Sequence, residues 1–155
     1  VHSDPGCLAQ MIDVYNGHGG GNVIAVEEVP ADQTDQYGVV EIDGQGDVFK
    51  VTGMVEKPPK GTAPSNLIIT GRYILQPEIF KLLETTEKGA GGEIQITDAM
   101  LTLMAEQAFH GLRFKGHTYD CGSKVGFLAA NVAYALDRDD LAAPFHAELK
   151  RLLGL

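Results

Sequence analysis

The sequence predicts an α/β fold with a mixed sheet. Aliphatic extended runs alternate with segments whose apolar residues recur at three- and four-residue spacing, which is typical of strands interleaved with amphipathic helices. One Asp-Gly turn joins two extended runs as a hairpin, whereas the other connections have the length of crossovers. Because a hairpin pairs antiparallel strands and crossovers allow parallel ones, the sheet is expected to contain both kinds of pair.

The first elements are a short helix and a buried strand. Apolar side chains recur at helical spacing over residues 5–15, and Asp4 is expected to cap this helix ahead of Pro5. The glycine-rich stretch 17–21 follows the helix, so we interpret it as a helix end and turn rather than as a phosphate-binding loop. The unbroken aliphatic run within 22–29 predicts a strand covered on both faces.

A hairpin is predicted for residues 37–42 and 48–55. It turns at Asp43-Gly44, because glycine accepts the positive φ that such turns require. Two consecutive prolines then lack backbone donors and end the ladder. Glu56 and Lys57 therefore stand at a rigid strand end.

The second half of the chain continues with further strands and helices. A strand over 67–75 is expected to be broken at Gly71, since glycine inside a strand marks a bulge or a close backbone approach. Apolar stripes and start signals place the remaining elements: helices at 76–83, at 98–108 with Thr97 as cap, at 124–136 with Ser123 as cap and at 144–153, and a strand at 112–115.

Length and composition limit the class of protein. The 155 residues suit a single domain spanning 1–155, and 44% hydrophobic residues are enough for a core. A net charge of -9 argues against nucleic acid or a membrane surface as partner, because both are bound through basic faces. No membrane-spanning run or signal-peptide pattern is present, so a cytoplasmic protein is expected.

Two places in the sequence hold candidate site residues, each with two interpretations. From residue type alone, Glu56 and Lys57 form a solvated ion pair at a strand tip. The alternative is that they bind a polar ligand. Asp120 precedes the helix capped by Ser123, so it either forms the turn or supplies the oxygen ligand that Mg²⁺ prefers. On residue type the turn is favoured. The carboxylates of Glu93 and Asp98 are interpreted as helix-start residues.

Five motifs in order carry a resemblance to a known family. They are Val55-Glu56-Lys57-Pro58, Ala63-Pro64-Ser65-Asn66, Thr70-Gly71-Arg72-Tyr73, Gly91-Gly92-Glu93-Ile94-Gln95-Ile96-Thr97-Asp98 and Tyr119-Asp120-Cys121-Gly122-Ser123-Lys124. With them the chain resembles the bacterial UDP-glucose pyrophosphorylases, over nearly its whole length. The resemblance implies a three-layer mixed sheet of the nucleotide-diphospho-sugar transferase (Rossmann-like) fold, present in part.

The resemblance also implies an activity and roles for residues. The reaction would be uridylyl transfer from UTP to glucose 1-phosphate, giving UDP-glucose and pyrophosphate, with Mg²⁺ as cofactor. Lys57 would be the catalytic cation on the sugar phosphate. Gly38, Glu56 and Ile69 would contact the sugar together with Lys57, and Asp120 would bind the metal. A homo-oligomer is expected, with the last helix as a candidate contact.

The glycine-rich nucleotide-binding loop of that family has no counterpart in the 155 residues. The chain is therefore expected to be the C-terminal, sugar-phosphate-binding half, without the N-terminal nucleotide-binding part and with little activity of its own. Two other functions stay open. One is a related nucleotidyltransferase that uses another sugar or base, and the other is a non-catalytic module for sugar-phosphate binding or assembly.

Overall fold

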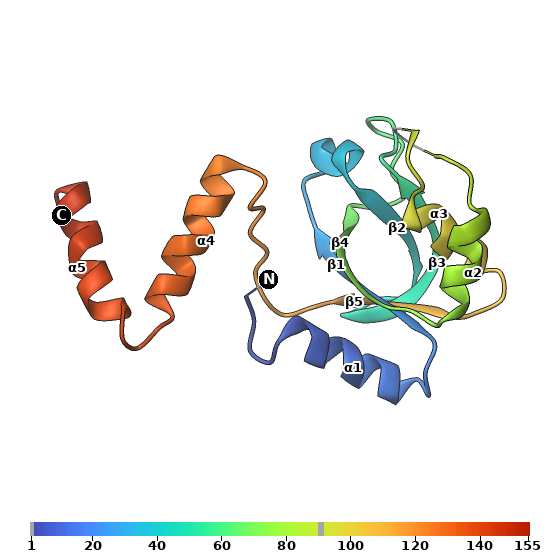
Figure 1. The fold of residues 1–155 in the computed structure, drawn as a ribbon, viewed down its shortest axis with the longest axis horizontal. Helices are drawn as coiled ribbons and strands as arrows, with labels where there is room; N and C mark the ends of the chain where they lie inside the picture. Colours follow the sequence, from blue (N-terminus) through green and yellow to red (C-terminus); the bar gives the residue numbers. More distant parts are fainter. Residues whose placement is uncertain (1, 90–91) are drawn as a thin grey trace. The chain divides into compact units, whose positions relative to one another are not determined.

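The computed structural model describes residues 2–89 and 92–155, so Gly91 of the fourth motif lies outside the described residues. The chain forms two compact units (Figure 1). The larger is Pro5–Lys115, and the smaller combines the residues before Pro5 with Gly116–Leu155.

Five strands of the larger unit form one mixed sheet. They are β1 (Asn22–Glu28), β2 (Gly38–Asp43), β3 (Val48–Glu56), β4 (Leu67–Ile74) and β5 (Phe109–Arg113). Their order is β1-β4-β2-β3-β5, and a parallel β1–β5 ladder closes the ring. The other four pairings are antiparallel. The predicted α/β class and mixed sheet are confirmed.

The hairpin and the glycine bulge follow the sequence closely. Strands β2 and β3 pair antiparallel around Gly44, whose φ of 114° requires glycine. Strand β4 runs unbroken past Gly71, but its register with β1 shifts between Ile24 and Val26. Gly71 lies in that bulge with φ 73°, so the predicted break is a bulge within one continuous strand.

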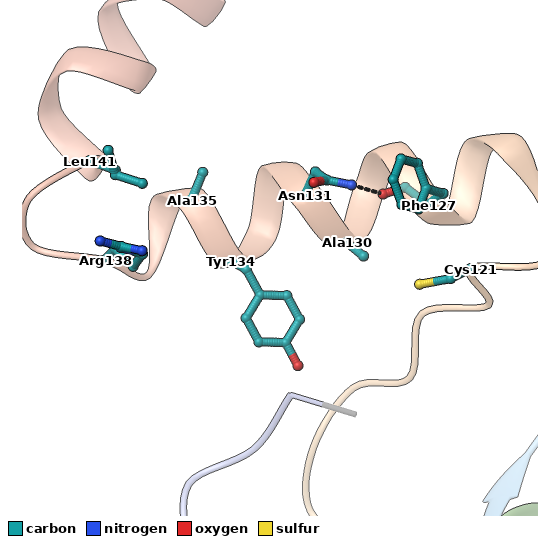
Figure 2. Close-up of a pocket in the computed structure, with 8 residues that line it drawn as sticks. All are labelled: Cys121, Phe127, Ala130, Asn131, Tyr134, Ala135, Arg138 and Leu141. Carbon is teal, nitrogen blue, oxygen red and sulfur yellow. Dashed lines mark hydrogen bonds between the residues drawn. The ribbon is translucent and has the colours of Figure 1, made fainter.

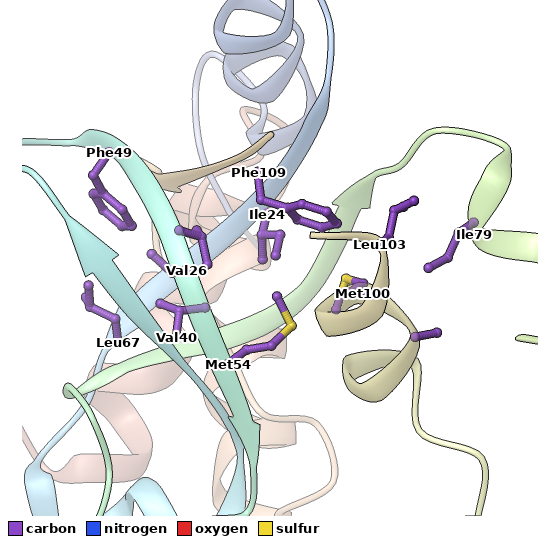
Figure 3. Close-up of a cluster of buried hydrophobic side chains, with 12 residues drawn as sticks. Ile24, Val26, Val40, Phe49, Met54, Leu67, Ile79, Met100, Leu103 and Phe109 are labelled. Carbon is purple, nitrogen blue, oxygen red and sulfur yellow. The ribbon is translucent and has the colours of Figure 1, made fainter. Parts of the chain in front are cut away.

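Helices cover the sheet and complete its core. Helix α1 (Cys7–Gly17) packs on β1, and α3 (Ile96–Leu103) packs on β3 and on α2 (Glu78–Thr85). A 3₁₀ helix, η1 (Ala31–Gln36), leads into β2. Figure 3 shows the main cluster of buried side chains, which come from the five strands and from α2 and α3. This cluster is made of Ile24, Val26, Val40, Phe49, Val51, Met54, Leu67, Ile79, Ala99, Met100, Leu103 and Phe109.

Three predictions at helix ends are wrong. Helix α1 begins at Cys7 with Gly6 as its N-cap, so Asp4 lies too far before the first turn to cap it. Helix α3 begins at Ile96, which places Thr97 inside the first turn rather than at the cap. It ends at Leu103, five residues before the predicted end.

The early end of α3 has a cause outside the helix itself. Residues 109–113 form β5 because they pair with β1 in parallel and with β3 antiparallel. Asn22 reinforces this arrangement, since its backbone and side-chain N–H groups both donate to the carbonyl of Ala108, at 3.1 and 3.2 Å. Strand β5 therefore begins three residues before the predicted strand.

The smaller unit holds α4 (Lys124–Leu136) and α5 (Ala142–Leu153). Ser123 caps α4 as predicted, because its hydroxyl accepts the backbone N–H of Gly126 at 2.9 Å. Across these two helices, which lie wholly within the described residues, Ala130 alone is buried. In the part of the chain that the structure describes, no helix is long and apolar enough to cross a bilayer.

Candidate functional site

The candidate site is built at the open end of the β2–β3 hairpin. Glu56, the last residue of β3, lies opposite Gly38, the first residue of β2. One residue further, the backbone N–H of Lys57 donates to the carbonyl of Tyr37 at 3.0 Å. The chain is thus held in register up to the residue before Pro58, which fixes where the Glu56 and Lys57 side chains begin.

Gly38 leaves the space in which the site groups converge. A Cβ placed on it would lie 2.9 Å from Oε2 of Glu56, 3.2 Å from Cδ1 of Ile69 and 3.6 Å from Oγ1 of Thr97. These groups come from β3, β4 and α3. The predicted residues Gly38, Glu56 and Ile69 therefore meet in one place, although they are well separated in the sequence.

The Glu56 carboxylate is oriented by two neighbours. The hydroxyl of Thr97 donates to Oε2 at 2.8 Å, and Oε1 lies 4.0 Å from Nζ of Lys57. The Glu56 side chain is 15% exposed, whereas that of Lys57 is 53% exposed. Glu56 is therefore held rather than solvated, and the Lys57 ammonium stays accessible to an anion.

The backbone of Lys57 is strained. It has φ 46°, and it is the one non-glycine residue with positive φ among those described. A left-handed conformation costs an L-residue roughly 1–2 kcal/mol. Such strain persists where the surroundings enforce it and gathers at ligand sites. Here the bond to Tyr37 on one side and Pro58 on the other hold the turn.

Tyr73 on β4 is coupled to the charge of Glu56. Burial raises the pKa of Tyr73, and the negative charge of Glu56 raises this pKa further, while Arg72 acts in the opposite direction. Tyr73 also packs against the core cluster. The phenol of Tyr73 is therefore kept in its neutral form by burial first and by the nearby carboxylate second.

Asp120 belongs to the smaller unit and forms a turn. Its Oδ1 accepts the backbone N–H of Gly122 at 2.9 Å, and its carbonyl accepts the hydroxyl of Ser123 at 3.1 Å. The side chain is exposed at the start of α4. Within residues 2–89 and 92–155, no group of three or more His, Cys, Asp or Glu side chains surrounds a common metal position.

A pocket of about 440 Å³ lies along α4 (Figure 2). Its lining is mostly apolar and is made of Cys121, Phe127, Ala130, Asn131, Tyr134, Ala135, Arg138 and Leu141. Apart from Asn131, Tyr134 and Arg138, the lining side chains carry no nitrogen or oxygen atom that could bind a phosphate. It shares no residue with the Glu56 site.

Sequence reasoning missed the role of Thr97. The Thr-Asp pair before an apolar stripe indicated a helix cap, and this local pattern contains no sign of a contact with Glu56, 41 residues earlier. The residue is 4% exposed, and this burial is visible only in the folded chain.

Comparisons with known proteins agree with the motifs. A family model described as nucleotidyl transferase matches residues 4–136. A UTP--glucose-1-phosphate uridylyltransferase of Staphylococcus epidermidis is 44% identical over 155 residues, covering 98% of this chain and 53% of the relative. One of Komagataeibacter xylinus is 47% identical over 126 residues, covering 81% of this chain and 44% of the relative.

Solved structures give the same result. A UDP-glucose pyrophosphorylase complexed with UDP-glucose is 40% identical, with a TM-score of 0.81 over 89% of this chain and 53% of that one. A UTP-bound UGPase from Acinetobacter baumannii is 40% identical, with a TM-score of 0.80 over 92% of this chain and 49% of that one. The chain spans about half the length of these relatives. Its motifs, its fold and these matches together show that it belongs to the nucleotidyl transferase family.

Proposed function

We propose that the protein transfers a uridylyl group from UTP to glucose 1-phosphate, and that this chain supplies the sugar-phosphate side of the site. The observation that carries the proposal is the convergence of Gly38, Glu56 and Ile69 beside the strained, half-exposed Lys57. The similarity to proteins named uridylyltransferases and UDP-glucose pyrophosphorylases supports the choice of substrates.

The reaction needs positioning and charge neutralisation more than covalent help. A phosphate oxygen of the sugar phosphate attacks the α-phosphorus of UTP. The bond from that phosphorus to the oxygen bridging to the β-phosphate breaks, and pyrophosphate leaves. Catalysis of such a step comes from holding the two anions in line and stabilising their charge.

Each residue at the end of the hairpin contacts a different part of the sugar phosphate. Lys57 binds the sugar phosphate and offsets its charge. Glu56 accepts a hydrogen bond from a sugar hydroxyl, as an ionised carboxylate oxygen can. Gly38 presents its backbone to the sugar, and Ile69 packs against the ring.

We propose Asp120 as the residue that would hold Mg²⁺. The carboxylate is exposed and Oδ1 already accepts the Gly122 N–H, so one oxygen remains for a cation. This donor set fits magnesium, which binds through one or two carboxylates and takes its other ligands from phosphates and water. When bound, the ion would offset phosphate charge. Asp120 can therefore form the turn and hold the ion at the same time.

Calorimetry with glucose 1-phosphate tests the sugar-phosphate role. Lys57→Ala is expected to weaken binding by about tenfold or more, because a charge-assisted hydrogen bond is lost. Lys60→Ala is the matched control, since Lys60 is also an exposed lysine near the tip but pairs with Asp35 at 3.7 Å. Equal affinities for glucose 1-phosphate and mannose 1-phosphate would favour another sugar nucleotidyltransferase. No binding at all would favour an assembly module.

We also propose that these 155 residues alone turn over little substrate, because the chain spans about half the length of its relatives. A coupled assay for pyrophosphate release, with UTP, magnesium and glucose 1-phosphate, measures this directly. Robust turnover by the isolated chain would refute it.

We also propose that the chain forms a homo-oligomer. Helices α4 and α5 expose large apolar side chains, among them Val125, Leu152 and Leu153 at 79%, 65% and 69%. Surfaces of this kind on a folded chain mark contacts with other protein surfaces. A second copy of the chain is the partner that we propose for them.

A further inference from the structure

We propose that Thr97 is a positioning residue of the site: its hydroxyl fixes the Glu56 carboxylate so that Oε1 is presented to the sugar. The inference rests on the proposed function, because it takes Glu56 as the residue that accepts hydrogen bonds from the sugar. Thr97 itself does not need to touch the substrate.

The first observation is that the two oxygens of the Glu56 carboxylate have different neighbours. Oε2 accepts the Thr97 hydroxyl at 2.8 Å, a bond to a charged acceptor and so one of the stronger kind. Oε1 lies 4.0 Å from the Lys57 ammonium, on the side where the phosphate of the sugar would bind. With one oxygen engaged by the protein, the other has a defined direction.

The second observation is how little else holds the carboxylate. Gly38 beneath it contributes no side chain, and the Lys57 contact at 4.0 Å is beyond hydrogen-bond length. Among residues 2–89 and 92–155, the side-chain hydrogen bond to this carboxylate therefore comes from the hydroxyl of Thr97. Without that donor, the Glu56 carboxylate, which is 15% exposed, would lose a hydrogen-bond partner and would rotate toward other donors.

The third observation is that Thr97 is itself buried, on a helix that packs into the core. It is 4% exposed and lies in the first turn of α3, whose Ala99, Met100 and Leu103 are buried in the core. A β-branched side chain has few χ1 choices in a helix, so the hydroxyl direction follows the helix. The positive end of the helix dipole also lies at this turn and favours a nearby carboxylate.

The consequence is that α3 contributes to sugar recognition through Glu56. A carboxylate with one fixed oxygen accepts a hydroxyl from one direction, whereas a rotating carboxylate would accept hydroxyls at several positions. Thr97 is therefore expected to support both the affinity for glucose 1-phosphate and the preference for it over its epimers.

Calorimetry with glucose 1-phosphate on five proteins tests the inference: wild type, Thr97→Val, Thr97→Ser, Glu56→Gln and the double variant Thr97→Val/Glu56→Gln. Valine keeps the shape and removes the donor, so affinity should fall by about five- to tenfold. Serine keeps the donor and should restore affinity to within about twofold of wild type. In the Glu56→Gln background, Thr97→Val should cause no further loss, because the two residues act as one unit.

The possible results separate the inference from the proposed function. If Glu56→Gln weakens binding but Thr97→Val does not, or if the two losses add, Thr97 is not a positioning residue and the proposed function stands. A serine variant as weak as the valine variant leads to the same conclusion. If Glu56→Gln leaves affinity unchanged, the sugar-binding role of Glu56 fails and the inference fails with it. Thr97→Ala, which removes the donor in a smaller side chain, replaces Thr97→Val if circular dichroism shows that the valine variant does not fold.

Discussion

Oε2 of Glu56 lies within 2.9 Å of the position that a Cβ on Gly38 would take, so the two residues cannot both keep their places if Gly38 gains a side chain. Gly38→Ala should lower the free energy of unfolding by about 1–3 kcal/mol through overpacking. It should also weaken glucose 1-phosphate binding, because the carboxylate must move. Denaturant unfolding and calorimetry measure the two effects.

Gly17→Ala is the control for that substitution. Gly17 is the last residue of α1, and a Cβ there would meet no atom within 4 Å. Its replacement should leave both stability and binding unchanged or slightly improved. A loss of stability equal to that of Gly38→Ala would show that crowding at Gly38 is not the cause.

Tyr73 gives a prediction about pH. Burial raises its pKa and the Glu56 charge adds to this, so folding favours the neutral phenol. The stability that follows is fully present below about pH 10 and is lost as the pH rises through the raised pKa. Glu56→Gln should lower the pKa of Tyr73 while leaving it above its ordinary value, because burial remains.

Titration by NMR of ring-labelled tyrosine follows this pKa residue by residue. Glu41→Gln, which removes another carboxylate from the same hairpin, should leave the pKa of Tyr73 unchanged. An identical pKa in wild type and Glu56→Gln would mean that the two side chains do not interact.

Single residues also show where sequence reasoning ends. Gly38, Glu56 and Ile69 were predicted as one site, and the structure brings them together. That prediction came from the resemblance to a known family, since nothing local in the sequence links positions so far apart. Thr97 was assigned to a cap because cap patterns are local, whereas its partner is contributed by another element. The metal role of Asp120 and the sugar contacts stay predictions.

Among the elements, the helix that begins at Lys124 tests the energetics of capping. Ser123→Ala should destabilise α4 by about 1 kcal/mol, because the Gly126 N–H loses its acceptor. Ser123→Gly should cost only a few tenths of a kcal/mol, since glycine is tolerated at this position. Circular dichroism during denaturant unfolding compares the two, and equal losses would show that the hydroxyl contributes nothing.

Elements with local signals were predicted better than those set by distant pairing. The hairpin at Gly44 and the helix after Ser123 each carry their turn or cap in adjacent residues, and both were placed within one residue. Strand β5 was placed late, because its bounds follow from pairing with the distant β1 in the register Asn22↔Phe109. Closure of the five strands into a ring likewise has no local signal.

For the whole molecule, the exposed apolar side chains of α4 and α5 predict self-association. Val125→Asp combined with Leu153→Asp should reduce the mass measured by light scattering to that of a single chain, because charges disfavour burial of the surface. Asn131→Asp, which adds a charge to an already polar position on α4, should leave the mass unchanged. A wild-type mass equal to that of one chain would contradict the homo-oligomer.

The left-handed backbone at Lys57 sets stability against activity in this molecule. Glycine would relax that backbone and yield a polypeptide more resistant to denaturant, yet one lacking the ammonium at the hairpin end. A search for thermostable variants would therefore select glycine at position 57 and discard the function that we propose, so this codon should be held fixed in any such library.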